Sequence, residues 1–306
     1  MSFFRMVKKN ARESLRGHWG AAAGIFALCA GIFGALAALD AFFVWLASGD
    51  VSLGGEPGYF LRLVFYSENR YGVMITAGFT LISLLLSPLY LGAQRYFYNA
   101  AAEIPPRFFD LFYFFTGPKK YMRALWLSIQ VNLRASLWGI LFFAFPGGIM
   151  LVSVRFLILE ELSRESRAAA SVGVVLACGL FLLAGILFGI FVQKYTLTAF
   201  LICSEDKSAG QIIKESVRAS KGHRGMLFLF SLSYIGWYIL APFTFFTLLI
   251  FYVLPSRSAG GMIMSRYLCE RRERMNRRPE PVASAEYTAK GREPEAPEDN
   301  ALYTGD

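Results

Sequence analysis

Long blocks of apolar residues, separated by short charged segments, fill most of this 306-residue chain. Solid apolar runs of about 20 residues are typical of helices that cross a membrane, whereas helices of soluble domains alternate apolar and polar faces. We therefore predict an all-α, polytopic transmembrane helical bundle of about six spans, joined by short cytoplasmic interfacial helices. The predicted spans cover approximately residues 20–47, 71–93, 121–154, 169–192, 225–241 and 245–267.

The last two predicted spans come from one stretch, because residues 225–256 contain no charge. A continuous helix of that length would rise about 45 Å, against about 30 Å of hydrocarbon. Pro242 lacks an N–H and offers a break, and Thr244 and Thr247 can bond the freed backbone groups. We interpret the stretch as a tight hairpin. Arg257 then lies near mid-depth, where an unpaired charge costs about 3 kcal/mol, and this cost keeps a single-span alternative open.

The distribution of Lys and Arg favours an even number of spans. Basic residues are concentrated in four segments at the ends of the apolar blocks: residues 1–19, 95–123, 194–224 and 266–278. Such segments gather on the cytoplasmic side, which here requires the 225–270 stretch to cross twice. We expect both termini in the cytoplasm. The integral membrane domain is predicted over residues 1–275, and the Pro- and Glu-rich residues 276–306 predict a disordered cytoplasmic tail.

Three short segments between the apolar blocks predict amphipathic or aromatic helices at the cytoplasmic face. Residues 1–19 mix basic and large apolar side chains, and residues 203–224 carry a capping serine, Ser208, and a stop at Gly222. The third helix is expected just before Gly117. Basic side chains near an anionic lipid surface contribute about 1 kcal/mol each. The headgroup-binding candidates are Lys8, Lys9, Arg12, Lys119, Lys120, Lys214 and Lys221.

The same three segments indicate an internal repeat. Each places a helix, a glycine and a basic or polar step before an apolar run: ARESLRGHWGAAAG, FYFFTGPKKYMRALW and SVRASKGHRGMLFLF, with Gly17, Gly117 and Gly222 at the break. The spacing of about 100 residues predicts three units, each with an interfacial helix and a two-helix hairpin. The alternative is that any protein built of membrane hairpins shows this pattern.

Composition agrees with a membrane protein and argues against nucleic acid as a partner. The chain is 55% hydrophobic and 17% charged. Its net charge of +9 would suit nucleic acid, but Lys and Arg lie at the ends of apolar runs and not along one exposed face. We interpret them as a topology signal. Membrane lipids are the expected partners, other membrane proteins are compatible with the pattern, and the oligomeric state does not follow from it.

Few polar residues occur inside the predicted spans, and these are the candidates for a site. Gln130 and Arg134 lie one turn apart on one face of the third span, and Arg257 lies in the sixth. Charged side chains at such depth usually face the bundle interior or a water-filled cavity. An interhelical hydrogen bond is an equal alternative for Arg134. Asp40 is either a partner for an intramembrane arginine or, as we favour, a helix-end residue that reaches the headgroups.

Residues suited to catalysis or metal binding are sparse. The two histidines, His18 and His223, each follow a glycine at a membrane boundary and have no nearby H-x-x-x-H, H-E-x-x-H or carboxylate cluster. The four cysteines lie in or beside apolar runs without C-x-x-C spacing. There is no phosphate-binding loop, nucleophile elbow or dinucleotide turn. We therefore expect a protein that is not an enzyme and that uses no cofactor and no metal.

Two segments carry a resemblance to a known family. The run AFLICSEDKSAGQIIKESVRASKGHRGMLFLFSLSYIGWYIL, with LPSRSAGGMIMSRYLCE after it, and the N-terminal ARESLRGHWG resemble the bacterial integral membrane proteins grouped as domain of unknown function 975. The resemblance covers nearly the whole chain apart from the tail, and it implies a multi-spanning fold in the bacterial inner membrane. It brings no established activity. Residues 155–192 depart from the family by being longer than its short turn after Pro-Gly.

Two functions fit these features. The first is a transport- or export-related role, with a polar cavity near Gln130, Arg134 and Arg257. A transporter would usually also place ion-coordinating Asp or Glu deep in its spans, and this chain has none there. The alternative is a non-catalytic structural or lipid-interacting role, in which basic helices bind anionic headgroups and polar residues in the spans hold helices together. The sequence names no substrate for either function.

Overall fold

The computed structural model describes residues 3–48, 70–158, 164–244 and 246–276. Over these residues the protein is helical and contains no strand. The chain divides into two compact units, Met1–Leu268 and Cys269–Asp306. The second unit is described only over the last residues of helix α12. Residues 277–306 of the predicted tail lie outside the described part.

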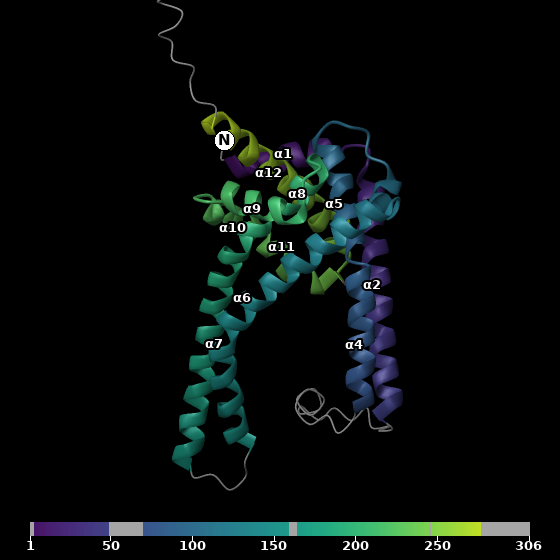
Figure 1. The fold of residues 1–306 in the computed structure, drawn as a ribbon. Helices are drawn as coiled ribbons and strands as arrows, with labels where there is room; N and C mark the ends of the chain where they lie inside the picture. The colour runs from purple at the N-terminus through teal and green to yellow at the C-terminus, as the bar shows by residue number, and fades with distance from the viewer. Residues whose placement is uncertain (1–2, 49–69, 159–163, 245, 277–306) are drawn as a thin grey trace, which may run out of the picture. The chain divides into compact units, whose positions relative to one another are not determined.

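Two long helical hairpins dominate the first unit. Helix α2 (Trp19–Ser48) runs beside α4 (Arg70–Leu85), and α6 (Pro118–Ile158) runs beside α7 (Arg164–Val192), as Figure 1 shows. The predicted connection around residues 49–69 is outside the described residues, as are residues 159–163, which follow α6 in the sequence.

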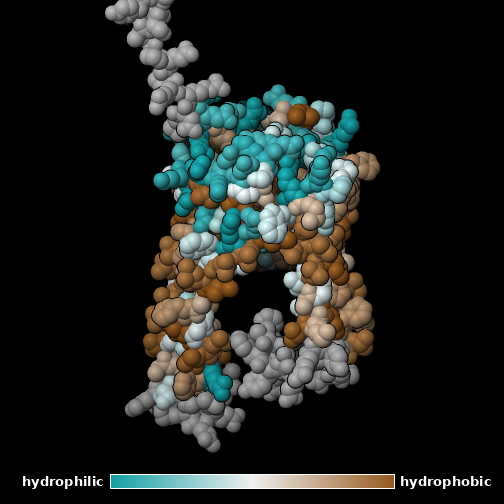
Figure 2. Space-filling view, in the orientation of Figure 1, coloured by the Kyte–Doolittle hydropathy of each residue, from teal (hydrophilic) through white to brown (hydrophobic). Residues whose placement is uncertain are grey.

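Four stretches in the described residues are long and apolar enough to cross a membrane. They are Trp19–Leu46, Gly72–Ala101, Pro118–Leu157 and Ala168–Ser204. Only 11 to 22% of the most apolar part of each is buried inside the protein, so most of these side chains are available to lipid. Figure 2 shows apolar residues covering the hairpins and hydrophilic residues gathered where the short helices lie. These features indicate a membrane location.

Helix α5 (Pro88–Ala101) lies at the centre of the hydrophobic core. Tyr96 and Phe97 of this helix are fully buried, with ring centroids 5.4 Å apart in an edge contact. The ring of Phe26 from α2 stacks on Phe97 at 5.3 Å. The core is completed by small and aliphatic residues of three other helices: Ala11, Leu15, Ala22, Ile25, Ala259 and Met262. Helices from both ends of the chain therefore meet on α5.

A short 3-10 helix, η1 (Phe108–Phe115), covers one side of α5. The two backbones approach so closely at Gly92 that a Cβ there would lie 1.8 Å from the carbonyl oxygen of Leu111. The Asp110 carboxylate caps the start of η1 and also accepts a hydrogen bond from the Asn99 amide of α5 at 2.9 Å. The aromatic segment before Gly117 thus forms the predicted short helix, and it is fixed to the core.

The two segments predicted as amphipathic helices are helical, but their apolar faces are covered by the protein itself. Helix α1 (Phe3–Ser14) buries Val7 and Ala11, and α9 (Ala209–Ala219) buries its two isoleucines. Helix α9 starts at the predicted cap, Ser208, with a capping box that closes its first turn. Placement of these helices at the membrane interface stays a prediction.

Two of the three glycines proposed to mark a repeat adopt the same backbone conformation. Gly17 and Gly222 both have φ +83°, and in each turn the next N–H donates to the carbonyl three residues earlier, at 2.9 and 3.0 Å. Each turn joins an amphipathic helix to an apolar one. Gly117 differs, because it has no positive φ and directly precedes Pro118 at the start of α6. The first and third predicted units therefore share this turn conformation, and the second unit does not.

Because L-residues disfavour positive φ, Gly222→Ala is expected to destabilise the protein by about 1 kcal/mol. The matched control is Gly210→Ala inside α9, where a Cβ would meet no atom within 4 Å. That substitution should stabilise the helix by about 0.5 kcal/mol. Thermal unfolding of the two purified variants in detergent measures both effects. If both substitutions shifted the melting temperature equally and in the same direction, the positive φ of Gly222 would not be needed for stability.

Residues 224–268 form a third, shorter hairpin. Its first leg consists of α10 (Arg224–Leu232) and α11 (Ile235–Leu240). Its second leg consists of a π-helix, η4 (Leu249–Val253), and the start of α12 (Leu254–Asn276). Contacts between α11 and η4 hold the two legs together.

The chain turns where Pro242 predicted a break. The short 3-10 helix η3 (Pro242–Thr244) follows α11, and the Thr244 hydroxyl donates to the Ala241 carbonyl at 3.0 Å. This carbonyl also accepts from the backbone N–H groups of Thr244 and Phe246, so it is not a group that Pro242 frees. The apolar first leg, Arg224–Leu240, is shorter than the other four apolar stretches. Two crossings by residues 225–270, and hence six spans, remain a prediction.

Pro146, Gly147 and Gly148 would be expected from the sequence to interrupt the third predicted span, but this break is not observed. Helix α6 continues through Pro146 to Ile158. A proline inside a membrane helix is tolerated where a neighbouring helix and local backbone adjustment satisfy the freed carbonyl. Helix α7 lies along this part of α6, and aromatic rings of the two helices interlock there.

Candidate functional site

A cavity of about 410 Å³ with a mostly apolar wall opens among helices α2, α5, α6, α10 and α12 and the segment that joins α7 to α8 (Thr198–Ser204). Aromatic and aliphatic side chains such as Phe26 and Phe230 form much of its wall. Three amides, from Gln94, Asn132 and Gln193, and several serine and threonine hydroxyls also line it. Polar groups at a few places in an apolar wall are typical of a small-molecule site.

Arg257 is the one charged side chain among the described residues that line this cavity. Its Nη1 donates a hydrogen bond to the Tyr238 hydroxyl at 2.7 Å. The short hairpin makes this possible, because it folds α11 back against the start of α12. No carboxylate forms a salt bridge with Arg257 in the described part of the chain. The tyrosine and the open cavity reduce the cost predicted for a charge at this position.

Tyr90 and Gln94, one turn apart on α5, face the same space. Gln94 is only 5% exposed, and Tyr90 lies within electrostatic range of both Arg257 and Tyr238. Helix α5 is rigid here because its other side carries the aromatic core. The cavity therefore combines one cation with fixed hydrogen-bonding groups, an arrangement suited to a small anion or to a polar molecule with several acceptor oxygens.

Of the four intramembrane candidates, the structure brings only Arg257 to the cavity. Arg134 lies on α6 within electrostatic range of Lys194. The side-chain oxygen of Gln130 is buried and finds no hydrogen-bond partner in the described residues. Asp40 accepts a hydrogen bond from the Thr76 hydroxyl of α4 at 3.2 Å, and among the described residues it forms no salt bridge with an arginine. The predicted grouping of Gln130 and Arg134 with Arg257 is not observed in the cavity lining.

The headgroup candidates on α1 are partly used inside the protein. Lys8 donates to the Ser233 carbonyl at 3.1 Å and lies 4.4 Å from the centre of the Tyr234 ring. Partial burial and then the charge of Arg12 lower the pKa of Lys8. Lys9 pairs with Glu13 at 3.7 Å. A groove of about 750 Å³ follows this face of the helix, with a lining that is mostly basic.

The other headgroup candidates lie at the start of α6 (Lys119 and Lys120), on α9 (Lys214) and in the turn after α9 (Lys221). Lys120 contacts the Tyr113 ring at 4.3 Å, and its side chain is exposed. Lys119, Lys214 and Lys221 are exposed as well. Contact of these lysines with anionic lipid stays a prediction. They are exposed on the surface and do not line a defined pocket.

Sequence reasoning missed Gln94, Gln193 and Tyr238. A buried amide in an otherwise apolar helix was a usable signal for Gln94, but the contribution of Tyr238 depends on the fold of the hairpin. Among the described residues there is no group of three or more His, Cys, Asp or Glu side chains that could hold a metal ion.

Comparison with known proteins yields one match. The model of a family described as "Protein of unknown function (DUF975)" matches residues 5–267. No curated protein and no solved structure matches the chain.

Proposed function

Since the chain belongs to the DUF975 family, whose function is unknown, we propose its function from the cavity: it is a multi-pass membrane protein, not an enzyme, that binds a small anionic solute at Arg257 in a transport- or export-related role. The proposal includes six spans, a bacterial inner-membrane location and cytoplasmic termini. The span number and the cytoplasmic termini are supported by the positive-inside distribution of Lys and Arg, and the bacterial inner membrane is what the family resemblance implies.

One observation carries the proposal: a guanidinium without a carboxylate partner in the described residues lies in a cavity of about 410 Å³. Pockets of roughly 300 to 1,000 Å³ hold small metabolites. The planar guanidinium offers paired donors that match a carboxylate or phosphate. Because Tyr238 occupies one Nη, the remaining donors of Arg257 are available to a bound anion.

The surroundings of Arg257 favour binding over catalysis. The lining supplies amides, hydroxyls and aromatic rings, and in the described residues it contains no histidine, cysteine or carboxylate to act as a base or nucleophile. A polar site enclosed by several membrane helices is the arrangement in which transporters hold their solutes.

Charge-selective labelling tests this proposal. Ser258, next to Arg257 in the cavity lining, is replaced by cysteine in a chain whose Cys29, Cys178, Cys203 and Cys269 are changed to serine. A negatively charged methanethiosulfonate reagent should modify Ser258→Cys about tenfold faster than a positively charged one of similar size, because Arg257 attracts the anion. Adding Arg257→Gln should remove this preference.

The sidedness of labelling separates the two candidate functions. Modification from both faces of the membrane, in intact cells and in inverted vesicles, is expected for a transport-related role. Modification from the cytoplasmic face alone would instead favour the lipid-interacting structural role, which the basic groove along α1 supports. If neither reagent modified Ser258→Cys, the result would contradict a cavity that solutes can enter.

A further inference from the structure

Lys194 and Arg224 lie over the same ring, that of Phe191, at 4.3 and 5.9 Å from its centre, and Arg134 of α6 is a third cation within electrostatic range of Lys194. None of the three lines the cavity at Arg257. Lys194, in the short 3-10 helix η2 (Gln193–Tyr195), is only 7% exposed. Its Nζ lies over three aromatic rings, at 4.2 Å from Trp138, 4.3 Å from Phe191 and 5.0 Å from Tyr195. The lysine makes no hydrogen bond or salt bridge through Nζ with the described residues.

Arg224 and Arg134 add two positive charges to this lysine. Arg224 is the first residue of α10, and its guanidinium carbon lies 5.9 Å from the centre of the Phe191 ring. Its Nε is buried and has no hydrogen-bond partner in the described residues. Both arginines lie near enough to Lys194 to repel its charge. The Phe228 ring, one turn along α10, fills the space at Gly189 of α7 and so fixes this junction.

The described residues provide no counter-charge for the three cations. None of the three belongs to a salt bridge there. Helix α9 reaches Lys194 through the Ser216 hydroxyl, which donates to the Lys194 carbonyl at 2.7 Å, but the neighbouring Glu215 is held by Lys207 at 2.7 Å. Cation–π contacts compensate a buried ammonium only in part, and a cluster of like charges without an anion is unfavourable. A bound anion from outside the chain would neutralise this excess of positive charge.

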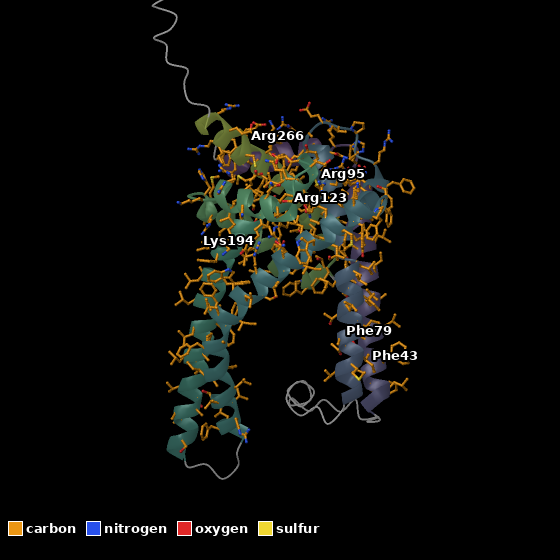
Figure 3. All side chains as sticks on the ribbon, viewed as in Figure 1. Phe43, Phe79, Arg95, Arg123, Lys194 and Arg266 are labelled. Carbon is orange, nitrogen blue, oxygen red and sulfur yellow. The ribbon has the colours of Figure 1, made fainter. Side chains whose placement is uncertain are left out.

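The position of the cluster points to the membrane surface as the source of that anion. Figure 3 shows Lys194 at the end of the α6–α7 hairpin, where the apolar helices meet the short polar ones of Figure 2. Tryptophan and tyrosine rings concentrate at the headgroup level of membranes. Leu137 of α6, next to Trp138, and Leu187 of α7, one turn before Phe191, are exposed and can contact acyl chains.

The start of α10 adds backbone donors to the cations. Its N-cap, His223, provides no side-chain cap, and a Cβ at Gly225 would meet no atom within 4 Å. The first N–H groups of a helix are without intrahelical partners and favour phosphate oxygens.

We propose that Lys194, Arg224 and Arg134 bind the phosphate of an anionic phospholipid whose acyl chains lie along the exposed apolar faces of α6 and α7. This site is separate from the solute cavity and does not depend on it. The exposed lysines are expected to contact headgroups at the protein surface. The proposed site differs from these contacts, because Lys194 is buried and lies over three aromatic rings.

The test uses Lys194→Met in the full-length protein, purified in a mild detergent and delipidated. Methionine fills the aromatic surround without a charge, so this variant should be at least as thermally stable as the natural protein when no lipid is added. Phosphatidylglycerol should raise the melting temperature of the natural protein, and phosphatidylcholine should not. The affinity for phosphatidylglycerol, counted as bound lipids by native mass spectrometry, should fall about fivefold or more for each removed charge.

A second variant and a matched control complete the test. Arg224→Gln should weaken phosphatidylglycerol binding as Lys194→Met does, whereas Arg218→Gln, at an exposed arginine of α9, should leave it unchanged. Equal binding by all four proteins would overturn the site. So would a Lys194→Met protein that is less stable without lipid and keeps its lipid affinity, because the lysine would then be structural. Glycerol 1-phosphate that stabilises the natural protein as well as the lipid does would overturn the lipid as the source of the phosphate.

Discussion

Replacing Gly92 with alanine is expected to leave little correctly folded protein. The new Cβ would lie 1.8 Å from the Leu111 carbonyl oxygen and 2.6 Å from its carbon, so the η1 backbone has to move off α5. Forcing extra volume into a tight contact costs about 3 kcal/mol at the upper end of such substitutions, and here the obstacle is backbone. Size-exclusion chromatography of a fluorescent fusion, followed by thermal unfolding of any monodisperse fraction, measures the loss.

The matched control is Gly78→Ala in α4, where a Cβ would meet no atom within 4 Å. This protein should elute and melt like the natural one. A Gly92→Ala protein that melts within about 2 °C of the natural protein would show that η1 is not fixed against α5.

Phe97→Ala should produce the second large effect, a loss of about 3 to 5 kcal/mol in the free energy of unfolding. The Phe97 side chain is 0% exposed, and its removal leaves a cavity between α2 and α5 where the Phe26 and Tyr96 rings now contact it. Denaturant or thermal unfolding in detergent, followed by circular dichroism, gives the difference.

Phe109 provides the comparison for this substitution, because its ring is 79% exposed. Phe109→Ala should change the stability by no more than about 0.5 kcal/mol. Similar losses for the two phenylalanines would mean that α5 is not the centre of the core.

The helical class and the two long hairpins could be predicted because their signal is local. A run such as Trp19–Leu46 carries its own length and hydropathy, whatever it packs against. The effect of Pro146 could not be predicted in this way. Whether a proline ends a helix depends on its surroundings, and here α7 packs along α6, which continues through Pro146.

For α1, the sequence pattern predicted the helix itself but not the partner of its apolar face. It identifies an apolar face, here Val7, Ala11 and Leu15, but it does not say what covers that face. Lipid was the natural expectation for a basic helix beside a membrane protein. In the structure this face belongs to the same core cluster as α5 and α12.

The candidate site was predicted only in part. Arg257 could be found as an isolated charge in an apolar stretch, but the cavity around it is assembled from six separate segments. Gln130 and Arg134 share a face of α6, which indicates a common direction and not a common partner. For Lys194, the nearby Phe191 and Tyr195 gave a local signal, whereas Trp138 joins them only through the pairing of α6 with α7.

The way α1 docks has a consequence for biosynthesis. This helix packs on α5, but it also contacts residues from the other end of the chain: Phe4 contacts the Phe230 ring, and Lys8 bonds the Ser233 carbonyl, 225 residues further along the chain. While the ribosome is still making the two long hairpins, α1 therefore has α5 beside it but lacks the part of its docking surface that α10 supplies. We expect α1 to reach its final position only after the short hairpin has been synthesised.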